Sequence, residues 1–69
     1  MRQDIIDSIN RMDNSALIDT AYTIGMIEHK QVNDFLSGLL KKGYRGVLKR
    51  NIKARALADE NIAEYVLQY

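Results

Sequence analysis

The feature that most restricts the fold of this chain is the spacing of its apolar residues between positions 30 and 42. In this segment, KQVNDFLSGLLKK, they recur at i, i+3, i+4, i+7 and i+8, the spacing of one face of an α helix: Val32, Phe35, Leu36, Leu39 and Leu40. Gly43 follows two lysines, and cations in a last turn with glycine just beyond are typical of a helix end. We therefore expect a core helix that ends near Gly43.

A first helix is expected over residues 2–12, because four apolar residues recur there on one helical face: Ile5, Ile6, Ile9 and Met12. Three short polar residues follow, and their side chains compete for backbone hydrogen bonds, which suits a turn and a helix cap. The sequence predicts Asn14 or Ser15 as the cap of the next helix.

The second helix is expected to run from this turn to Gly25, which can adopt the left-handed conformation that ends helices. Its apolar side consists of Leu17, Ile18, Ala21 and Ile24.

Beyond Gly43, helical spacing fits better than strand alternation, and it predicts an apolar face that buries Tyr44, Val47, Leu48 and Ile52. Two interpretations remain open. One long helix over 44–69 is consistent with later residues that return to the same arc: Ile62, Tyr65, Val66 and Tyr69. Alternatively, the helix breaks near Ala58, and Asp59 caps a separate short helix with Glu60 in its first turn.

The chain is expected to form one all-α domain over 1–69, a bundle of three to four helices with a helix-turn-helix-like pair. A chain of 69 residues buries only about 60% of the surface of its unfolded form, so a second core is not available. It contains no Cys, so disulfides cannot reinforce this small core. We therefore expect a homodimer.

Several functional classes are disfavoured. No apolar run approaches the ~20 residues of a membrane span, and the first ten residues do not resemble a signal peptide, so we expect a soluble cytoplasmic protein without a membrane partner. His29 is the only histidine, and no Ser or Cys is placed as a partnered nucleophile. We expect no enzymatic activity, metal or cofactor.

The charge is unevenly distributed. Residues 41–55, KKGYRGVLKRNIKAR, hold seven of the ten Lys and Arg residues and no Asp or Glu, whereas the rest of the chain carries a net charge of −6. Such a cluster favours a polyanionic partner. The expected phosphate contacts are Lys41, Lys42, Arg45, Lys49, Arg50, Lys53 and Arg55. If residues 41–53 continue as one helix, four of these cations form a stripe: Lys42, Arg45, Lys49 and Lys53.

Residues 21–44 resemble the helix-turn-helix superfamily of DNA-binding proteins. The resemblance rests on AYTIG at 21–25 and on VNDFLSGLLKKGY at 32–44, where the spacing also looks like the recognition helix of winged-helix relatives. It implies that the helix over 30–42 enters the major groove, although the periodicity after Gly43 disfavours a wing. Its implied base contacts are Lys30, Gln31, Asn33 and Ser37.

Three interpretations of these surfaces remain. We expect a small non-enzymatic regulator that binds DNA in preference to RNA. The alternative is a protein-protein interaction module, or inhibitor, whose basic face docks on an acidic partner. The third interpretation assigns no function: the polar residues of the helix over 30–42 and of the basic segment 41–55 are then ordinary solvated side chains.

Overall fold

The computed structural model describes residues 2–27, 38 and 40–69, and this part of the chain forms four α helices. They are α1 (Gln3–Arg11), α2 (Asn14–Thr23), α4 (Arg45–Ala58) and α5 (Glu60–Val66), and a wide helical turn, η2 (Leu40–Tyr44), leads into α4. The all-α bundle is confirmed, and no strand occurs in the described residues. The helix expected over 30–42 falls mostly outside them.

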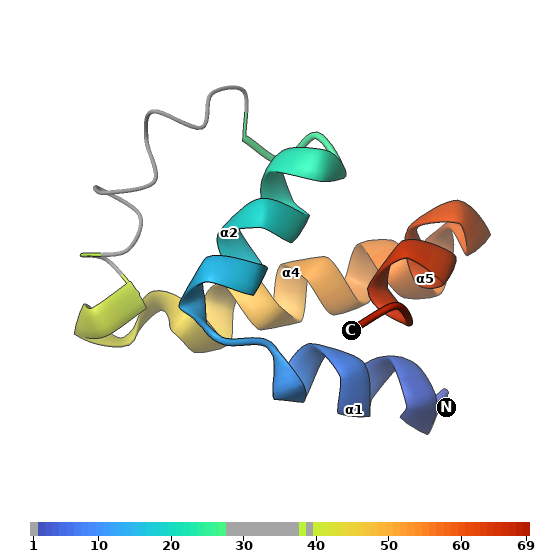
Figure 1. The fold of residues 1–69 in the computed structure, drawn as a ribbon, viewed down its shortest axis with the longest axis horizontal. Helices are drawn as coiled ribbons and strands as arrows, with labels where there is room; N and C mark the ends of the chain where they lie inside the picture. Colours follow the sequence, from blue (N-terminus) through green and yellow to red (C-terminus); the bar gives the residue numbers. More distant parts are fainter. Residues whose placement is uncertain (1, 28–37, 39) are drawn as a thin grey trace.

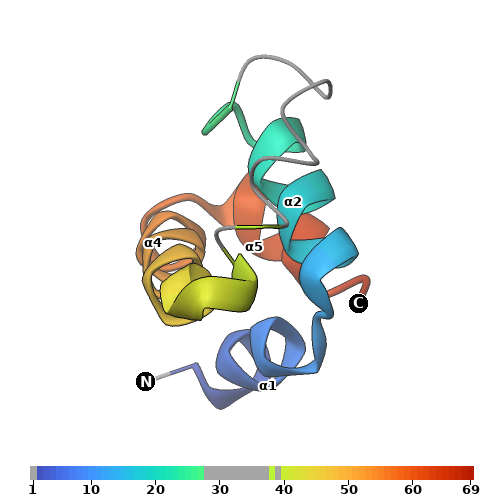
Figure 2. The same cartoon turned by 90° about the vertical axis from the view of Figure 1, so that its left-hand side faces the viewer.

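Helix α4 runs through the middle of the molecule, which is 31 Å along its longest axis (Figure 1). Helix α1 packs against α4 and α5, and α2 packs against α4. The turn η2 lies at one end of the long axis, and the junction of α4 with α5 lies towards the other (Figure 1). Figure 2, seen from the η2 end, shows α1, α2 and α4 arranged around a common centre.

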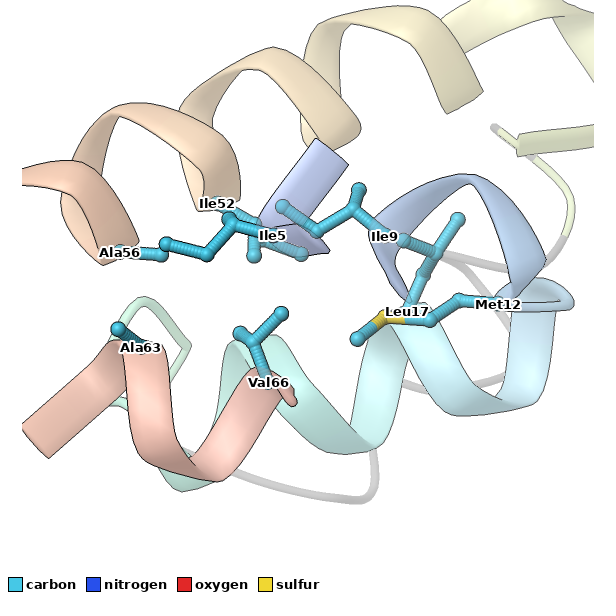
Figure 3. Close-up of a cluster of buried hydrophobic side chains, with 8 residues drawn as sticks. All are labelled: Ile5, Ile9, Met12, Leu17, Ile52, Ala56, Ala63 and Val66. Atoms are coloured by element: carbon cyan, nitrogen blue, oxygen red, sulfur yellow. The ribbon is translucent and has the colours of Figure 1, made fainter. Parts of the chain in front are cut away.

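That centre is an apolar core to which all four helices contribute (Figure 3). Its buried side chains are Ile5, Ile9, Met12, Leu17, Ile52, Ala56, Ala63 and Val66. The expected face of α1 is largely confirmed, because Ile5, Ile9 and Met12 are buried, whereas Ile6 stays half-buried. Packing of these side chains is the main source of stability in a chain of this size.

The turn between α1 and α2 differs from expectation in its cap. The carboxylate of Asp13 accepts a hydrogen bond of 2.8 Å from the backbone N–H of Ala16, so Asp13 is the N-cap, and the prediction of Asn14 or Ser15 is wrong. Helix α2 already begins at Asn14, one residue earlier than a cap at Asn14 allows and two residues earlier than a cap at Ser15 allows.

The end of α2 is as predicted. Gly25 has a φ of 83°, in the left-handed region. The N–H of Gly25 donates to the carbonyl of Tyr22, and the N–H of Met26 donates to the carbonyl of Ala21. This pair of bonds is the Schellman motif, which satisfies carbonyls at the helix end that have no partner within the helix.

The apolar face of α4 is rotated from its predicted position. Its buried side chains are Ile52 and Ala56, with Leu48 half-buried, a spacing of i, i+4 and i+8. Tyr44 is 54% exposed and Val47 is 45% exposed, so the expectation that both lie in the core is wrong. Tyr44 and Val47 lie to one side of the arc formed by Leu48, Ile52 and Ala56, and their side chains face solvent.

The second interpretation of the C-terminal segment is confirmed: α4 and α5 are separate helices. Asp59 takes an extended conformation, with φ −141° and ψ 115°, and its carboxylate accepts a hydrogen bond of 2.9 Å from the N–H of Asn61. A single residue therefore both ends α4 and caps α5, and it turns Ala63 and Val66 into the core.

Replacing Asp59 by Ala should lower the free energy of unfolding by about 1 kcal/mol, because the N-cap bond of α5 is lost. Asp59→Asn is the matched control, since its side-chain oxygen can accept the same bond, and it should stay close to the wild type. Urea unfolding followed by circular dichroism measures both. Equal losses in the two variants would show that the cap does not hold α5.

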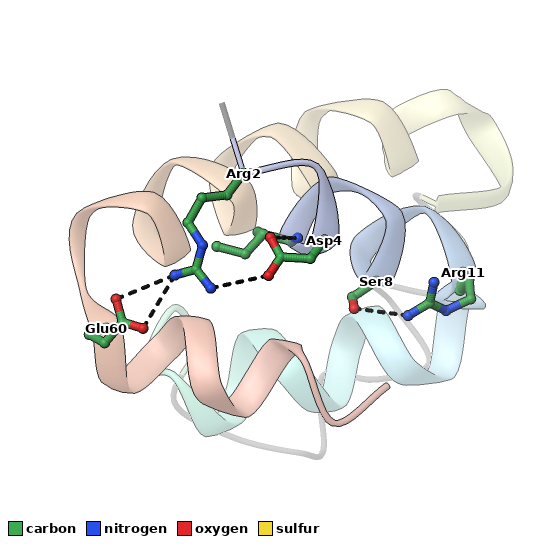
Figure 4. Close-up of polar contacts among 6 residues, drawn as sticks. Arg2, Asp4, Ser8, Arg11 and Glu60 are labelled. Carbon is green, nitrogen blue, oxygen red and sulfur yellow. Dashed lines mark hydrogen bonds and ion pairs between the residues drawn. The ribbon is translucent and has the colours of Figure 1, made fainter.

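The first residue of the described chain ties α1 to α5. The Arg2 guanidinium lies 3.2 Å from the carboxylates of both Asp4 and Glu60 (Figure 4). The hydrogen bond from Arg2, together with the backbone N–H of Ile5, lowers the pKa of Asp4 below its ordinary value. All three charged groups are exposed, so the contribution to stability is small and screened by salt.

The lowered pKa of Asp4 has a defined consequence at acid pH. Its folded pKa is below its unfolded value of about 3.9, so the stabilisation is present above that value and is lost as the pH falls through the folded pKa. Asp4→Asn should therefore flatten the acid limb of a plot of unfolding free energy against pH. An acid limb that is unchanged in Asp4→Asn would show that the contacts of Asp4 do not couple folding to pH.

Candidate nucleic-acid interface

The basic residues of the segment 41–55 have no acidic partner within the described part of the chain. The ion pairs in that part are formed by Arg2 with Asp4 and Glu60, near the junction of α4 with α5. Within the described residues, the seven cations of η2 and α4 are therefore not neutralised by an ion pair. Charge that a fold leaves unpaired is available to an external anion.

The basic residues do not form the single stripe that a continuous helix predicts. Gly43, with a φ of 102°, interrupts the helical path between η2 and α4. Lys41 and Lys42 are exposed on η2, before this kink. The expected alignment of Lys42 with the cations of α4 is wrong, because the two segments are not one helix.

Arg45 has a structural role that the sequence did not predict. Its guanidinium donates to the backbone carbonyl of Met12 and to the side-chain oxygen of Asn14. These bonds join the first residue of α4 to the connection between α1 and α2, and the side chain is half-buried there. Arg45 is thus directed at its own protein rather than fully towards solvent.

Lys49, Arg50 and Lys53 lie together on the flank of α4 that faces α1. With Gly46 they line one side of a groove of about 380 Å³, and the other side is lined by Ile6, Ile9 and Asn10 of α1. We call this feature the α1–α4 groove. Along α4 it extends from Gly46 to Lys53, about 10 Å at 1.5 Å per residue. Its apolar part comes from α1, and its three charges come from α4.

The position of Lys49 in the groove perturbs its pKa. Burial, with a smaller effect from the positive charge of Arg45, lowers the pKa of Lys49 below that of an ordinary lysine. Desolvation and a like-charged neighbour both disfavour the ammonium form. The negative charge of an anion in the groove would favour the ammonium form and so oppose this lowering of the pKa.

The two exposed arginines of α4 point in different directions. At 100° per residue, Arg55 lies about 140° around the helix from Arg50, on the flank away from the α1–α4 groove. We define the basic face as the two exposed lysines of η2 together with the three cations of α4 that line the groove: Lys41, Lys42, Lys49, Arg50 and Lys53. The structure brings Lys49, Arg50 and Lys53 together along one groove. Lys41 and Lys42 lie on the turn before the kink, and Arg45 and Arg55 lie outside this set.

The base contacts implied by the resemblance, Lys30, Gln31, Asn33 and Ser37, lie outside the described residues. Conversely, sequence reasoning missed the contribution of α1 to the site, namely Ile6, Ile9 and Asn10. The signal that was available is Gly46, a glycine inside a helix and directly after Arg45. Nothing in the sequence indicated which helix it faces.

Other kinds of site are not formed by the described residues. They include no group of three His, Cys, Asp or Glu side chains that could hold a metal ion. None of the helices in this part of the chain is both long and apolar enough to cross a bilayer. Comparison with protein-family models, with curated proteins and with solved structures finds no match to this chain.

Substitution of Arg45 should separate its structural role from that of its neighbours. We expect Arg45→Ala to lower the free energy of unfolding by about 1 to 3 kcal/mol, the usual cost of removing hydrogen bonds of a charged group. Arg50→Ala, on the same helix but exposed, should change it by less than about 0.5 kcal/mol. Urea denaturation of both variants measures the difference. Equal stability of the two would mean that the contacts of Arg45 contribute nothing.

Proposed function

We propose that this chain is a small DNA-binding protein without enzymatic activity, and that the basic face contacts the phosphate backbone. The contacts assigned to this face are Lys41, Lys42, Lys49, Arg50 and Lys53. Cations held on one surface bind DNA by releasing the counterions condensed on it.

The observation that carries the proposal is that this charge has no ion-pair partner among the described residues. Within the described residues, none of these five cations forms an ion pair. A chain with nine carboxylates has ample means to neutralise them internally. Instead, the acidic residues Asp59, Glu60 and Glu64 lie at and beyond the far end of α4. This separation of positive and negative charge along α4 would orient the molecule with η2 and the first turns of α4 towards a polyanion.

The start of α4 adds to the attraction. Tyr44 makes no side-chain cap bond, and the first turn of α4 contains no acidic residue. The first backbone N–H groups of a helix lack partners within it and carry partial positive charge. Next to Lys41 and Lys42 they favour an anion rather than a carboxylate of the protein itself.

Recognition of bases is assigned to the segment that resembles a helix-turn-helix recognition helix. There, Gln31 and Asn33 have the side chains that pair with adenine edges, and Lys30 and Ser37 can reach bases or phosphates. In this proposal, the basic face sets the position on the duplex and these residues provide sequence preference.

Arg50 and Arg55 provide a matched test, because both are exposed arginines of α4 on different flanks. Arg50→Glu should weaken duplex binding by about tenfold or more and reduce the slope of log Kd against log salt by about 1. Arg55→Glu makes the same change in net charge and should have a clearly smaller effect. Fluorescence anisotropy with a labelled duplex, repeated at several salt concentrations, measures both quantities.

Two results would contradict the proposal. Absence of binding to any duplex at low salt would reject DNA binding altogether. Equal losses in the two variants would reject the assigned face, because only net charge would then matter. Circular dichroism of each variant checks that the helices are intact.

A further inference from the structure

We propose that the α1–α4 groove is a docking site for an acidic amphipathic helix of a partner protein. This inference goes beyond DNA binding and does not depend on it. It rests on the combination of apolar and cationic groups in one groove, which a phosphate backbone does not need.

The apolar side of the groove is formed by α1. Ile9 is 2% exposed and belongs to the core, while Ile6 is half-buried and extends that apolar surface to the solvent boundary. Gly46 leaves the opposite wall without a side chain, and a Cβ built there meets no atom within 4 Å. Space and apolar surface are therefore available between the two helices.

The charged side of the groove has a regular spacing. Lys49 and Lys53 are four residues apart in α4, one helical turn, and Arg50 lies beside them. Among the residues that the structure describes, no carboxylate lines the groove. Carboxylates placed one turn apart on a partner helix would match this spacing, and charge complementarity of this kind selects the partner and speeds association.

A helix is the ligand that can contact both the apolar side and the charged side of the groove. Two packed helices present a groove that accepts a third helix, and such a ligand anchors apolar residues at i and i+4 while its flanks stay polar. A ridge of leucines would cover Ile6, and glutamates on the adjoining flank would reach Lys49 and Lys53.

A DNA duplex fits this groove less well. Its surface is convex and bears charged phosphates, so the isoleucine side would gain nothing and would desolvate a phosphate that came close. The groove is also only about 10 Å long, one and a half to two helical turns of α4. Lys41 and Lys42, the cations of the basic face that do not line the groove, can bind phosphates without a phosphate entering the groove.

The test uses a labelled helix-forming peptide of about 15 residues, with leucines one turn apart and glutamates one turn apart on the adjoining flank. Two control peptides replace either the glutamates by glutamines or the leucines by serines. We expect the full-length protein to bind the first peptide with a Kd on the order of 10 µM, and each control at least about tenfold more weakly. Anisotropy measures all three.

Gly46→Leu should block the groove without removing a charge, because its side chain enters open space and the helical backbone at this position is unstrained. We expect at least about tenfold weaker binding of the acidic peptide. Ala54→Leu is the matched control, since it adds a leucine to an exposed position of the same helix, and it should bind like the wild type. Duplex binding should be retained in both variants, because all five cations remain.

Three results would overturn the inference. Equal affinity for the acidic and the glutamine peptides would show that the cations are not used. Loss of duplex binding in Gly46→Leu, with the peptide unaffected, would assign the groove to DNA. Self-association of the wild type in sedimentation experiments that Gly46→Leu abolishes would assign the groove to a second copy of this chain.

Discussion

Burial of one face of α4 is the constraint on which the rest of this structure depends. Ile52 is fully buried at the centre of the core, and Ala56, one turn later, is almost so. Together with half-buried Leu48, they fix the rotation of α4 about its own axis. Because the helix cannot turn without exposing Ile52, every other side chain of α4 has a fixed direction.

The directions of the cations follow from this rotation. Lys49 and Lys53 face α1, Arg45 reaches the connection between α1 and α2, and Arg55 lies on the far flank from Arg50. A rotation by one residue, about 100°, would bring Val47 into the core and carry Lys49 and Lys53 away from α1. The burial of the core side chains and the directions of the surface cations therefore both follow from the same rotation of α4.

Local patterns were sufficient for most of the helices, and tertiary packing decided the rest. The face of α1 and the end of α2 at Gly25 follow from periodicity and from the backbone freedom of glycine, both local properties. In α4, by contrast, the predicted face contained both Val47 and Ile52. Only packing against the neighbouring helices decides that Ile52 and Ala56 are buried and that Val47 is not.

The candidate site was less predictable than the fold for the same reason. The cluster of basic residues is visible in the sequence, but its division into a basic face, Arg45 and Arg55 requires the kink at Gly43 and the phase of α4. The α1–α4 groove joins residues some forty positions apart, such as Ile6 and Gly46. No local pattern in the sequence indicates which distant segments become neighbours in the fold.

The two proposed partners would interact through shared charge. Lys49 and Lys53 belong both to the basic face and to the α1–α4 groove, whereas Lys41 and Lys42 belong to the basic face alone. An acidic helix in the groove would neutralise the shared lysines and so weaken the attraction for DNA, and DNA would weaken helix binding by the same factor, because coupling between two equilibrium affinities is reciprocal. Since the coupling is electrostatic, it should diminish as salt screens the charges. Unpaired cations on one helix thus allow binding of one anionic partner to depend on the other without any change of fold.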